Sequence, residues 1–137
     1  MDDKLRSHVM RTTVFSLDGD KVDPQIDEKP EWQPFNEYDG KPLTKVALVE
    51  LLQRGTCEMQ LVEIRAGGHF AMHSSPDIAF CQIVYGRGEL GLPDGTELRY
   101  EGPELYVFMP DTLHDWHDVE EDTLLSVCLI EARNSNL

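Results

Sequence analysis

Short apolar runs separated by turn residues dominate the chain from residue 46 onward. The runs are rich in β-branched and aromatic residues, and they lie at 46–52, 58–64, 80–85, 89–92, 97–100, 105–109 and 123–130. Between them, Gly- and Pro-containing sequences of the kind that forms tight turns stand at 66–68, 86–88, 93–95 and 102–103. Strands repeated at about 8–12 residues are typical of an all-β sandwich or barrel. We therefore predict an all-β domain over residues 46–137.

Residues 1–45 have a different pattern. They are polar and rich in Asp, Glu and Pro, with one strand-like run at 12–17 and an aromatic segment at 32–38. A segment of this composition buries little apolar surface by itself. We predict that residues 1–45 form an N-terminal arm that wraps the barrel or crosses to a partner subunit. Only residues 45–54 could form a helix, because their apolar positions fit the periods of helix and strand equally well.

The charge of the chain limits its partners. A length of 137 residues fits one domain, and the 26 acidic residues outnumber Lys and Arg by 14. Residues 101–131 contain nine acidic residues and no Lys or Arg. Such a surface repels nucleic acid and anionic membranes, so we expect neither as a partner. A solvated acidic face is the favoured explanation, and a surface for a cationic partner or substrate is the alternative.

Cysteine usage and the N-terminal residues bear on compartment and assembly. The three cysteines, Cys57, Cys81 and Cys128, each lie in an apolar run, and an odd number argues against a disulfide framework. Residues 1–20 lack the apolar stretch of a signal peptide, and no window resembles a transmembrane span. We expect a cytoplasmic protein. The Pro-rich arm and an exposed barrel edge both favour a homodimer.

Glycine and histidine recur at a characteristic spacing in the middle of the chain. Five residues separate Gly67 from His73, and six separate Ala79 from Gly86. In residues 105–118 a strand-like run ends in Pro, and a turn and a His follow it. This framework resembles the two sequence motifs of the cupin family and, with its flanks, covers more than half of the chain. The resemblance implies a small double-stranded β-helix, or jelly-roll, barrel with a polar N-terminal extension.

The resemblance also implies a set of candidate metal ligands. In metal-binding cupins, two His and a Glu of the first motif converge inside the barrel with a His of the second motif. His73 matches the first of these positions and His114 the last, whereas Ser75 and Ala79 stand at the second His and the Glu. Such ligands suit one divalent transition metal, namely Fe, Zn, Mn or Ni. Strand alternation places His69 on the face of His73, so His69, His73 and His114 could form a site of three nitrogens.

Other residues are predicted to line the same pocket, because of their strand parity or their chemistry: Ser75, Cys81, Gln82, Trp116 and Asp118. Cys81 could be a pocket residue, a soft ligand or a small buried apolar side chain. Trp116 and Asp118 share the parity of His114, whereas His117 is expected on the opposite face among the acidic residues.

Three functions remain open from the sequence. The first is a small-molecule cupin enzyme whose metal polarises a carbonyl or binds oxygen, as a dioxygenase, isomerase, decarboxylase or polyketide-type cyclase. The second is a metal-free isomerase or cyclase in which His73 and His114 are the catalytic acid and base. The third is a non-catalytic cupin that binds a small ligand, which the two replaced ligand positions favour. A fold does not select among these reactions.

Overall fold

The structure, a computed structural model, describes residues 11–28 and 30–132. The chain divides into two compact units, one ending at Trp32 and the other beginning at Gln33. The described residues contain no helix, and so none with the length and apolar character needed to cross a membrane. The all-β prediction is confirmed, and residues 45–54 belong to a strand rather than a helix.

The first unit contains a two-stranded hairpin of β1 (Thr12–Asp18) and β2 (Lys21–Asp27). The antiparallel register places Leu17 opposite Val22 and Phe15 opposite Pro24. Because cross-strand partners share a face, these residues form an apolar ladder together with Ile26. Phe15 is 69% exposed and Leu17 is 73% exposed, so nothing within the hairpin covers the ladder. The role of the arm in wrapping the barrel or a partner stays a prediction.

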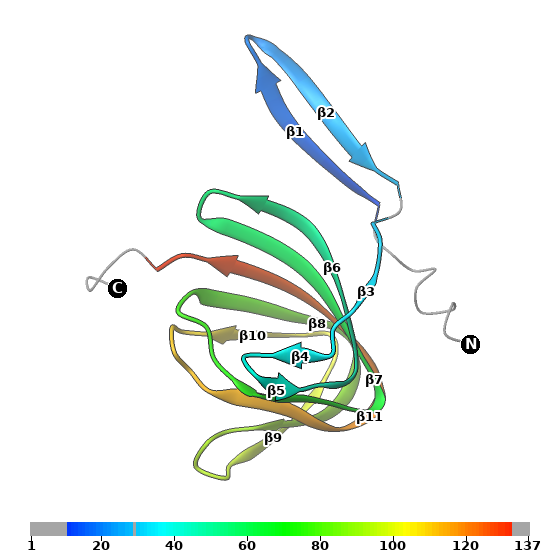
Figure 1. Cartoon of the computed structure of the whole chain (residues 1–137), viewed down its shortest axis with the longest axis vertical. Helices are drawn as coiled ribbons and strands as arrows, with labels where there is room; N and C mark the ends of the chain where they lie inside the picture. Colours follow the sequence, from blue (N-terminus) through cyan, green and yellow to red (C-terminus); the bar gives the residue numbers. More distant parts are fainter. Residues whose placement is uncertain (1–10, 29, 133–137) are drawn as a thin grey trace. The chain divides into compact units, whose positions relative to one another are not determined.

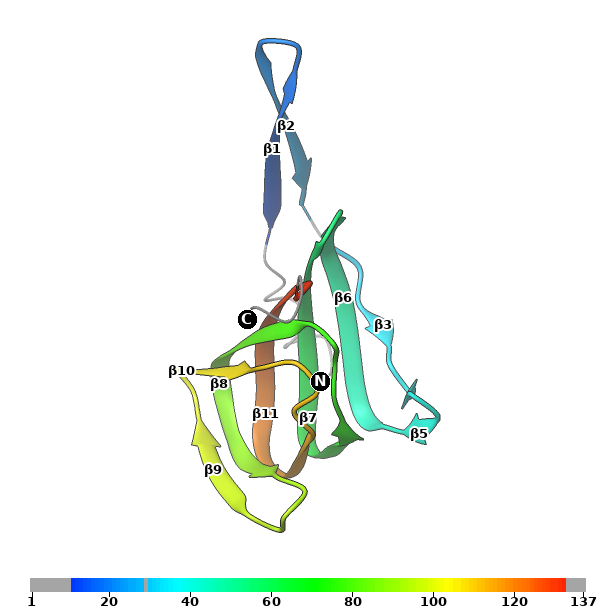
Figure 2. The same ribbon diagram turned by 90° about the vertical axis from the view of Figure 1, so that its left-hand side faces the viewer.

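The second unit is the barrel. Its strands are β3 (Gln33–Pro34), β4 (Glu37–Tyr38), β5 (Lys41–Pro42), β6 (Thr44–Arg54), β7 (Cys57–His73), β8 (Ile78–Gly91), β9 (Glu97–Glu101), β10 (Glu104–Phe108) and β11 (His114–Ile130). The main sheet has the order β10-β8-β11-β7-β6-β3, and β9 also pairs with β8. Figures 1 and 2 show the long strands β7, β8 and β11 curving around the interior of this unit. Residues 33–45, which the sequence pattern groups with the arm, contribute β3, β4 and β5 to the barrel unit.

Glycines let the long strands bend where the sequence predicts turns. The expected turns at 66–68 and 86–88 are wrong, because both segments lie inside continuous strands, β7 and β8. Gly86 has a φ of 108°, and a Cβ at this position would lie 2.5 Å from the Cα of Thr123 on β11. Only glycine fits that conformation and that close approach. The hairpin at 93–95 is confirmed, with the amide of Gly95 donating to the carbonyl of Leu92 at 3.0 Å.

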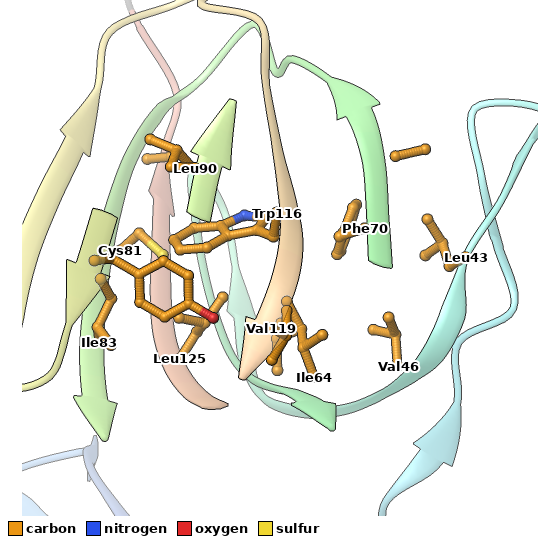
Figure 3. Close-up of a cluster of buried hydrophobic side chains, with 14 of the residues drawn as sticks. Leu43, Val46, Ile64, Phe70, Cys81, Ile83, Leu90, Trp116, Val119 and Leu125 are labelled. Atoms are coloured by element: carbon orange, nitrogen blue, oxygen red, sulfur yellow. The ribbon is translucent and has the colours of Figure 1, made fainter. Parts of the chain in front are cut away.

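The core of the barrel is built around Trp116. Figure 3 shows Trp116 among the inward side chains of the surrounding strands, including Cys81, Leu90 and Leu125. Trp116 is 2% exposed, and its ring meets that of Tyr100 edge to face at 5.2 Å. Large aromatic rings dominate the burial of apolar area in cores of this size. Trp116 therefore forms one wall of the barrel interior and fixes where β11 lies.

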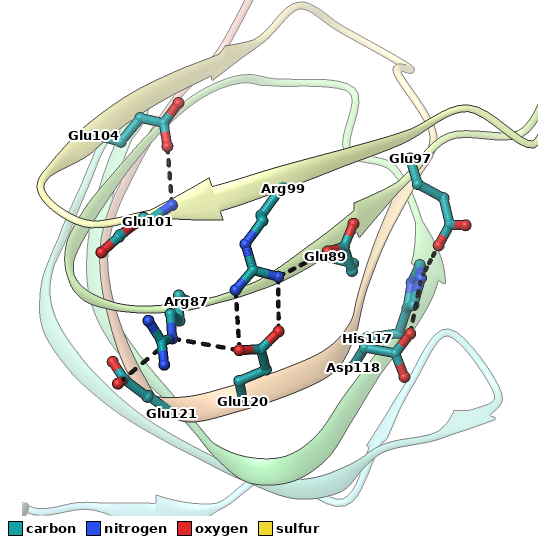
Figure 4. A network of polar contacts seen from close by, with 10 residues as sticks. All are labelled: Arg87, Glu89, Glu97, Arg99, Glu101, Glu104, His117, Asp118, Glu120 and Glu121. Carbon is teal, nitrogen blue, oxygen red and sulfur yellow. Dashed lines mark hydrogen bonds and ion pairs between the residues drawn. The ribbon is translucent and has the colours of Figure 1, made fainter.

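The outer face of β8, β9 and β11 carries a network of ion pairs (Figure 4). Arg99 binds both carboxylate oxygens of Glu120, at 2.6 and 2.9 Å, and Arg87 lies within 3.5 Å of Glu120 and Glu121. These partners come from outside the acidic stretch 101–131, so neighbouring strands neutralise part of that stretch. Exposed pairs of this kind contribute about 0–1 kcal/mol each.

Candidate active site

A cavity of about 140 Å³ opens in the barrel interior. Most of its wall is apolar, and its aromatic side chains are Phe35, Tyr38, Phe70, Phe108 and Trp116. Both imidazoles predicted for the site, His73 and His114, line it as well. Two strands supply them, since His73 ends β7 and His114 begins β11, and the two residues are partners in the antiparallel register.

A bulge in β7 decides which side chains face this cavity. His114 pairs with His73 and Trp116 pairs with Phe70, so three steps along β7 match two steps along β11. The extra residue breaks the alternation of side chains, as in other β-bulges. As a result Phe70 and His73 both line the cavity, although strict alternation would place them on opposite faces.

The same bulge turns His69 away from the cavity. The side chain of His69 is 42% exposed, and its Nε2 lies 3.7 Å from Oδ2 of Asp115 rather than beside His73. The structure therefore brings His73 and His114 together but does not add His69 to them. The predicted site of His69, His73 and His114 does not form, because a register shift of one residue in β7 places His69 on the other face.

Each of the two pocket imidazoles is held by a backbone carbonyl. Nδ1 of His73 lies 2.8 Å from the carbonyl oxygen of Ala71, and Nδ1 of His114 lies 3.0 Å from that of Thr112. Because a carbonyl only accepts hydrogen bonds, Nδ1 carries the proton in each neutral ring. The lone pair of each ring is then on Nε2. The ring centroids lie 4.4 Å apart, so one ligand can meet both nitrogens.

Burial keeps both imidazoles uncharged. Burial is the main cause that lowers the pKa of His73, and the charge of Lys41 adds to it, against the hydrogen bond to Ala71. Burial, helped by the neighbouring His73, lowers the pKa of His114 to about 4. His114 also stacks on Phe108 with centroids 3.7 Å apart, which fixes its ring plane. At neutral pH the pocket thus contains two neutral imidazoles.

The other predicted pocket residues divide into two groups. Ser75, Cys81 and Trp116 line the cavity, as strand parity suggests. Gln82 and Asp118 do not: Gln82 is on the outer face of β8, and the side chain of Asp118 is 77% exposed. A positive φ of 44° at Asp118 and irregular pairing after His117 end the alternation of β11 there.

A metal ion needs more donors than the cavity offers. Among residues 11–28 and 30–132, the one group of three His, Cys, Asp or Glu donor atoms within 4.8 Å of one another is Glu97, His117 and Asp118. This group could hold an ion, but it lies on the outer face and shares no residue with the cavity (Figure 4). Burial raises the pKa of Cys81 to about 12, so its thiol is protonated at neutral pH without a metal ion. The cavity therefore does not fit the full ligand set that the cupin resemblance implies.

Several residues of the cavity were not predicted. Phe35 and Tyr38 come from the segment assigned to the arm. Asp77 lies inside the first motif, between Ser75 and Ala79, and was only a lower-ranked candidate for the carboxylate in a second register of that motif. The sequence shows an aromatic segment at 32–38, but it does not show that this segment packs into the barrel cavity. Phe108 at the end of β10 could have been found, because it stands two residues before the Pro that ends its strand.

Comparison with known proteins identifies the fold at low sequence identity. No protein-family model and no curated protein matches the chain. A cupin 2 conserved barrel domain protein from Rhodopseudomonas palustris has a TM-score of 0.65 at 17% identity, covering 79% of this chain and 76% of its own. The Cnp3 cupin domain of Schizosaccharomyces pombe has a TM-score of 0.64 at 13% identity, covering 90% of this chain and 87% of its own. The barrel is thus a cupin-2 conserved barrel by fold.

An activity is named for some of the similar structures. The polyketide cyclase RemF from Streptomyces resistomycificus has a TM-score of 0.59 at 15% identity, covering 68% of this chain and 70% of its own. Some structural relatives of this chain are therefore enzymes, and at such identity the likeness concerns the fold alone.

Proposed function

We propose that this chain is a small-molecule enzyme that catalyses proton transfer in the barrel cavity, with His73 and His114 as its catalytic pair. The observation that carries the proposal is the pair itself: two adjacent neutral imidazoles, each with Nδ1–H bound to a carbonyl and Nε2 free. An isomerisation or cyclisation needs a proton removed from one substrate atom and returned to another.

The two imidazoles take different parts in this proposal. We assign His73 as the general base, because burial and the neighbouring His73 lower the pKa of His114 to about 4 and make His114 a poor proton acceptor. Nε2 of His73 accepts the proton from the substrate while Nδ1–H stays bound to Ala71. His114, with a pKa of about 4, stays neutral and accepts a hydrogen bond from the substrate. Aromatic walls exclude water, which strengthens both interactions.

Deuterium exchange of phenylacetone tests this proposal. Phenylacetone is neutral, has one ring, and carries acidic C–H bonds beside a carbonyl, so a general base exchanges them with D2O. We expect the wild-type protein to accelerate the exchange about 10²-fold over buffer, as a positioned base does, with proton NMR as the measurement. His73→Ala should return the rate to that of buffer.

His117→Ala is the matched control, because it removes an imidazole from the outer face of the same strand as His114. Its rate should equal that of the wild type. A wild-type rate no faster than buffer, or an unchanged rate in His73→Ala, contradicts the proposed role of the pair.

A ligand-binding protein without turnover is the second candidate function. Ser75 and Ala79 line the cavity at the positions where metal-binding cupins have their second His and their Glu, and the loss of these two groups favours binding without turnover. The two candidates differ in the same assay. Saturable binding of phenylacetone with no exchange above buffer supports the binding protein and excludes the enzyme for this class of substrate.

A further inference from the structure

The size of the cavity limits its ligand to one ring. A dry apolar cavity of about 150 Å³ in another protein accommodates benzene. The cavity here has about 140 Å³ and is walled by rings from β4, β7, β10 and β11, among them Tyr38, Phe70, Phe108 and Trp116. A single aromatic ring fills such a space, whereas a fused polycyclic skeleton exceeds it.

The charge around the cavity has one sign. None of the described residues that line it is Lys or Arg, and the carboxylate of Asp77 is their one charged group. Lys41, whose charge helps to lower the pKa of His73, is not part of the lining, and its Nζ donates a hydrogen bond to the carbonyl oxygen of Met72 at 2.7 Å. An anionic ligand would therefore find no counter-ion in the wall of the cavity.

A second hollow next to the cavity is also lined by acidic residues. It has a volume of about 100 Å³, and Asp77 and Leu129 line both spaces, so the two adjoin each other. Glu58 and Glu131 also line the second hollow. Burial, together with the charges of Asp39, Asp77 and Glu58, raises the pKa of Tyr38, which lines the cavity together with Asp77. Carboxylates beside aromatic faces attract organic cations.

The polar atoms inside the cavity also favour a ligand that donates hydrogen bonds. Nε2 of His73 and Nε2 of His114 both accept hydrogen bonds, as their Nδ1 atoms are bound to carbonyls. An ammonium group offers three donors and no acceptor. Acceptors, carboxylates and aromatic faces together match a ligand that is rich in donors and positively charged.

We infer that the cavity binds a small aromatic amine, with one ring against the aromatic wall and an ammonium group on a short chain at Asp77. The inference rests on the proposed function in one respect, that this amine is the substrate on which the His pair acts. It adds the chemical class of the ligand, which neither the fold nor the His pair defines.

Three probes that share a 2-phenylethyl group and differ in the charge of its terminal group test the inference: 2-phenylethylamine, 2-phenylethanol and 3-phenylpropanoate. Dissociation constants are measured with the full chain by isothermal titration calorimetry at pH 7.5. We expect the amine to bind at least ten-fold more tightly than the propanoate, with the alcohol between them, because a charge-assisted hydrogen bond contributes about this much.

Variants of Asp77 assign the preference to its carboxylate. Asp77→Asn should weaken the binding of the amine about ten-fold and change the affinity for the alcohol less than two-fold. Asp77→Lys should make the propanoate bind more tightly than the amine. The matched control is Asp94→Asn, which removes one negative charge at the turn after β8, where an Asn can still accept from the Thr96 amide. This control should leave all three constants unchanged, and thermal unfolding verifies that each variant folds.

The outcomes separate this inference from the proposed function. Equal affinities for amine and propanoate, or an amine affinity that Asp77→Asn leaves unchanged, overturn the inference even when phenylacetone exchange depends on His73. A preference for the amine that depends on Asp77, found together with exchange independent of His73, supports the ligand class and overturns the catalytic role.

Discussion

His114 and His117 stand three residues apart on β11 and have opposite environments. His114 is 6% exposed, stacks on Phe108 and has a pKa lowered to about 4, chiefly by burial. The side chain of His117 is 24% exposed, and its two nitrogens lie 2.8 Å from Asp115 and 2.6 Å from Glu97. Burial opposes the charge of His117 too, but the hydrogen bonds to Glu97 and Asp115 outweigh it and raise the pKa. The two faces of β11 therefore lower the pKa of one imidazole and raise that of the other.

The largest expected effect is the pH dependence of stability due to His114. Below pH 6.5 the unfolded chain binds a proton at His114, and the folded chain does not until about pH 4. The free energy of unfolding should therefore fall by about 3 kcal/mol as the pH is lowered from 6.5 to 4. His114→Phe keeps the stacking on Phe108 and should lose this component, measured as the difference between urea titrations of the two proteins. Parallel pH curves for the two proteins would show that His114 is not buried as a neutral base.

Removing the two side chains should have unequal costs. His114→Ala leaves a cavity beside Phe108, and we expect it to lower the free energy of unfolding by about 2 kcal/mol. His117→Ala removes an outer-face ion pair and should lower it by less than about 1 kcal/mol. Urea unfolding at pH 7.5 compares both variants with the wild type. An equal loss of unfolding free energy in the two variants would contradict the difference in burial between His114 and His117.

The charge of His117 should depend on Glu97. Its imidazole should titrate above the ordinary value of 6.5, because both nitrogens donate to carboxylates. Glu97→Gln removes one of these negative charges and should lower the pKa of His117 while the resonances of His114 keep their positions. Two-dimensional NMR of the imidazole protons between pH 5 and 9 measures both. A titration of His117 that Glu97→Gln leaves in place would refute the pairing.

The smallest expected effect is that of chelation. Among the described residues, the cavity brings two imidazole donors together and no third. Treatment with EDTA should therefore shift the thermal midpoint by less than about 1 °C and leave phenylacetone exchange unchanged. Elemental analysis of the same samples provides the metal content. A transition metal at one equivalent that is lost in His73→Ala would show that the cavity completes a metal site.

The sequence predicts the barrel better than it predicts the pocket. Turn spacing and the glycine framework indicate an all-β cupin barrel, and single positions such as His73, His114 and Trp116 follow from motif spacing and parity. His69 could not be assigned correctly, because the bulge that turns it outward depends on pairing with β11 and not on local sequence. Phe35 and Tyr38 were missed for a related reason: their segment looks like a polar arm until β3 pairs with β6.

The hairpin of β1 and β2 has a consequence for the colloidal stability of the protein in solution. One of its faces presents Phe15, Leu17, Val22 and Ile26 to solvent, and the opposite face carries Asp23 and Asp27. At neutral pH the net charge of −14 keeps copies of the chain apart through long-range repulsion. Near the pI of about 4.5 the net charge is zero, so long-range repulsion no longer keeps the exposed apolar faces of different copies apart. Colloidal stability, and with it the yield of any purification, should therefore depend on pH and salt more steeply than folding does.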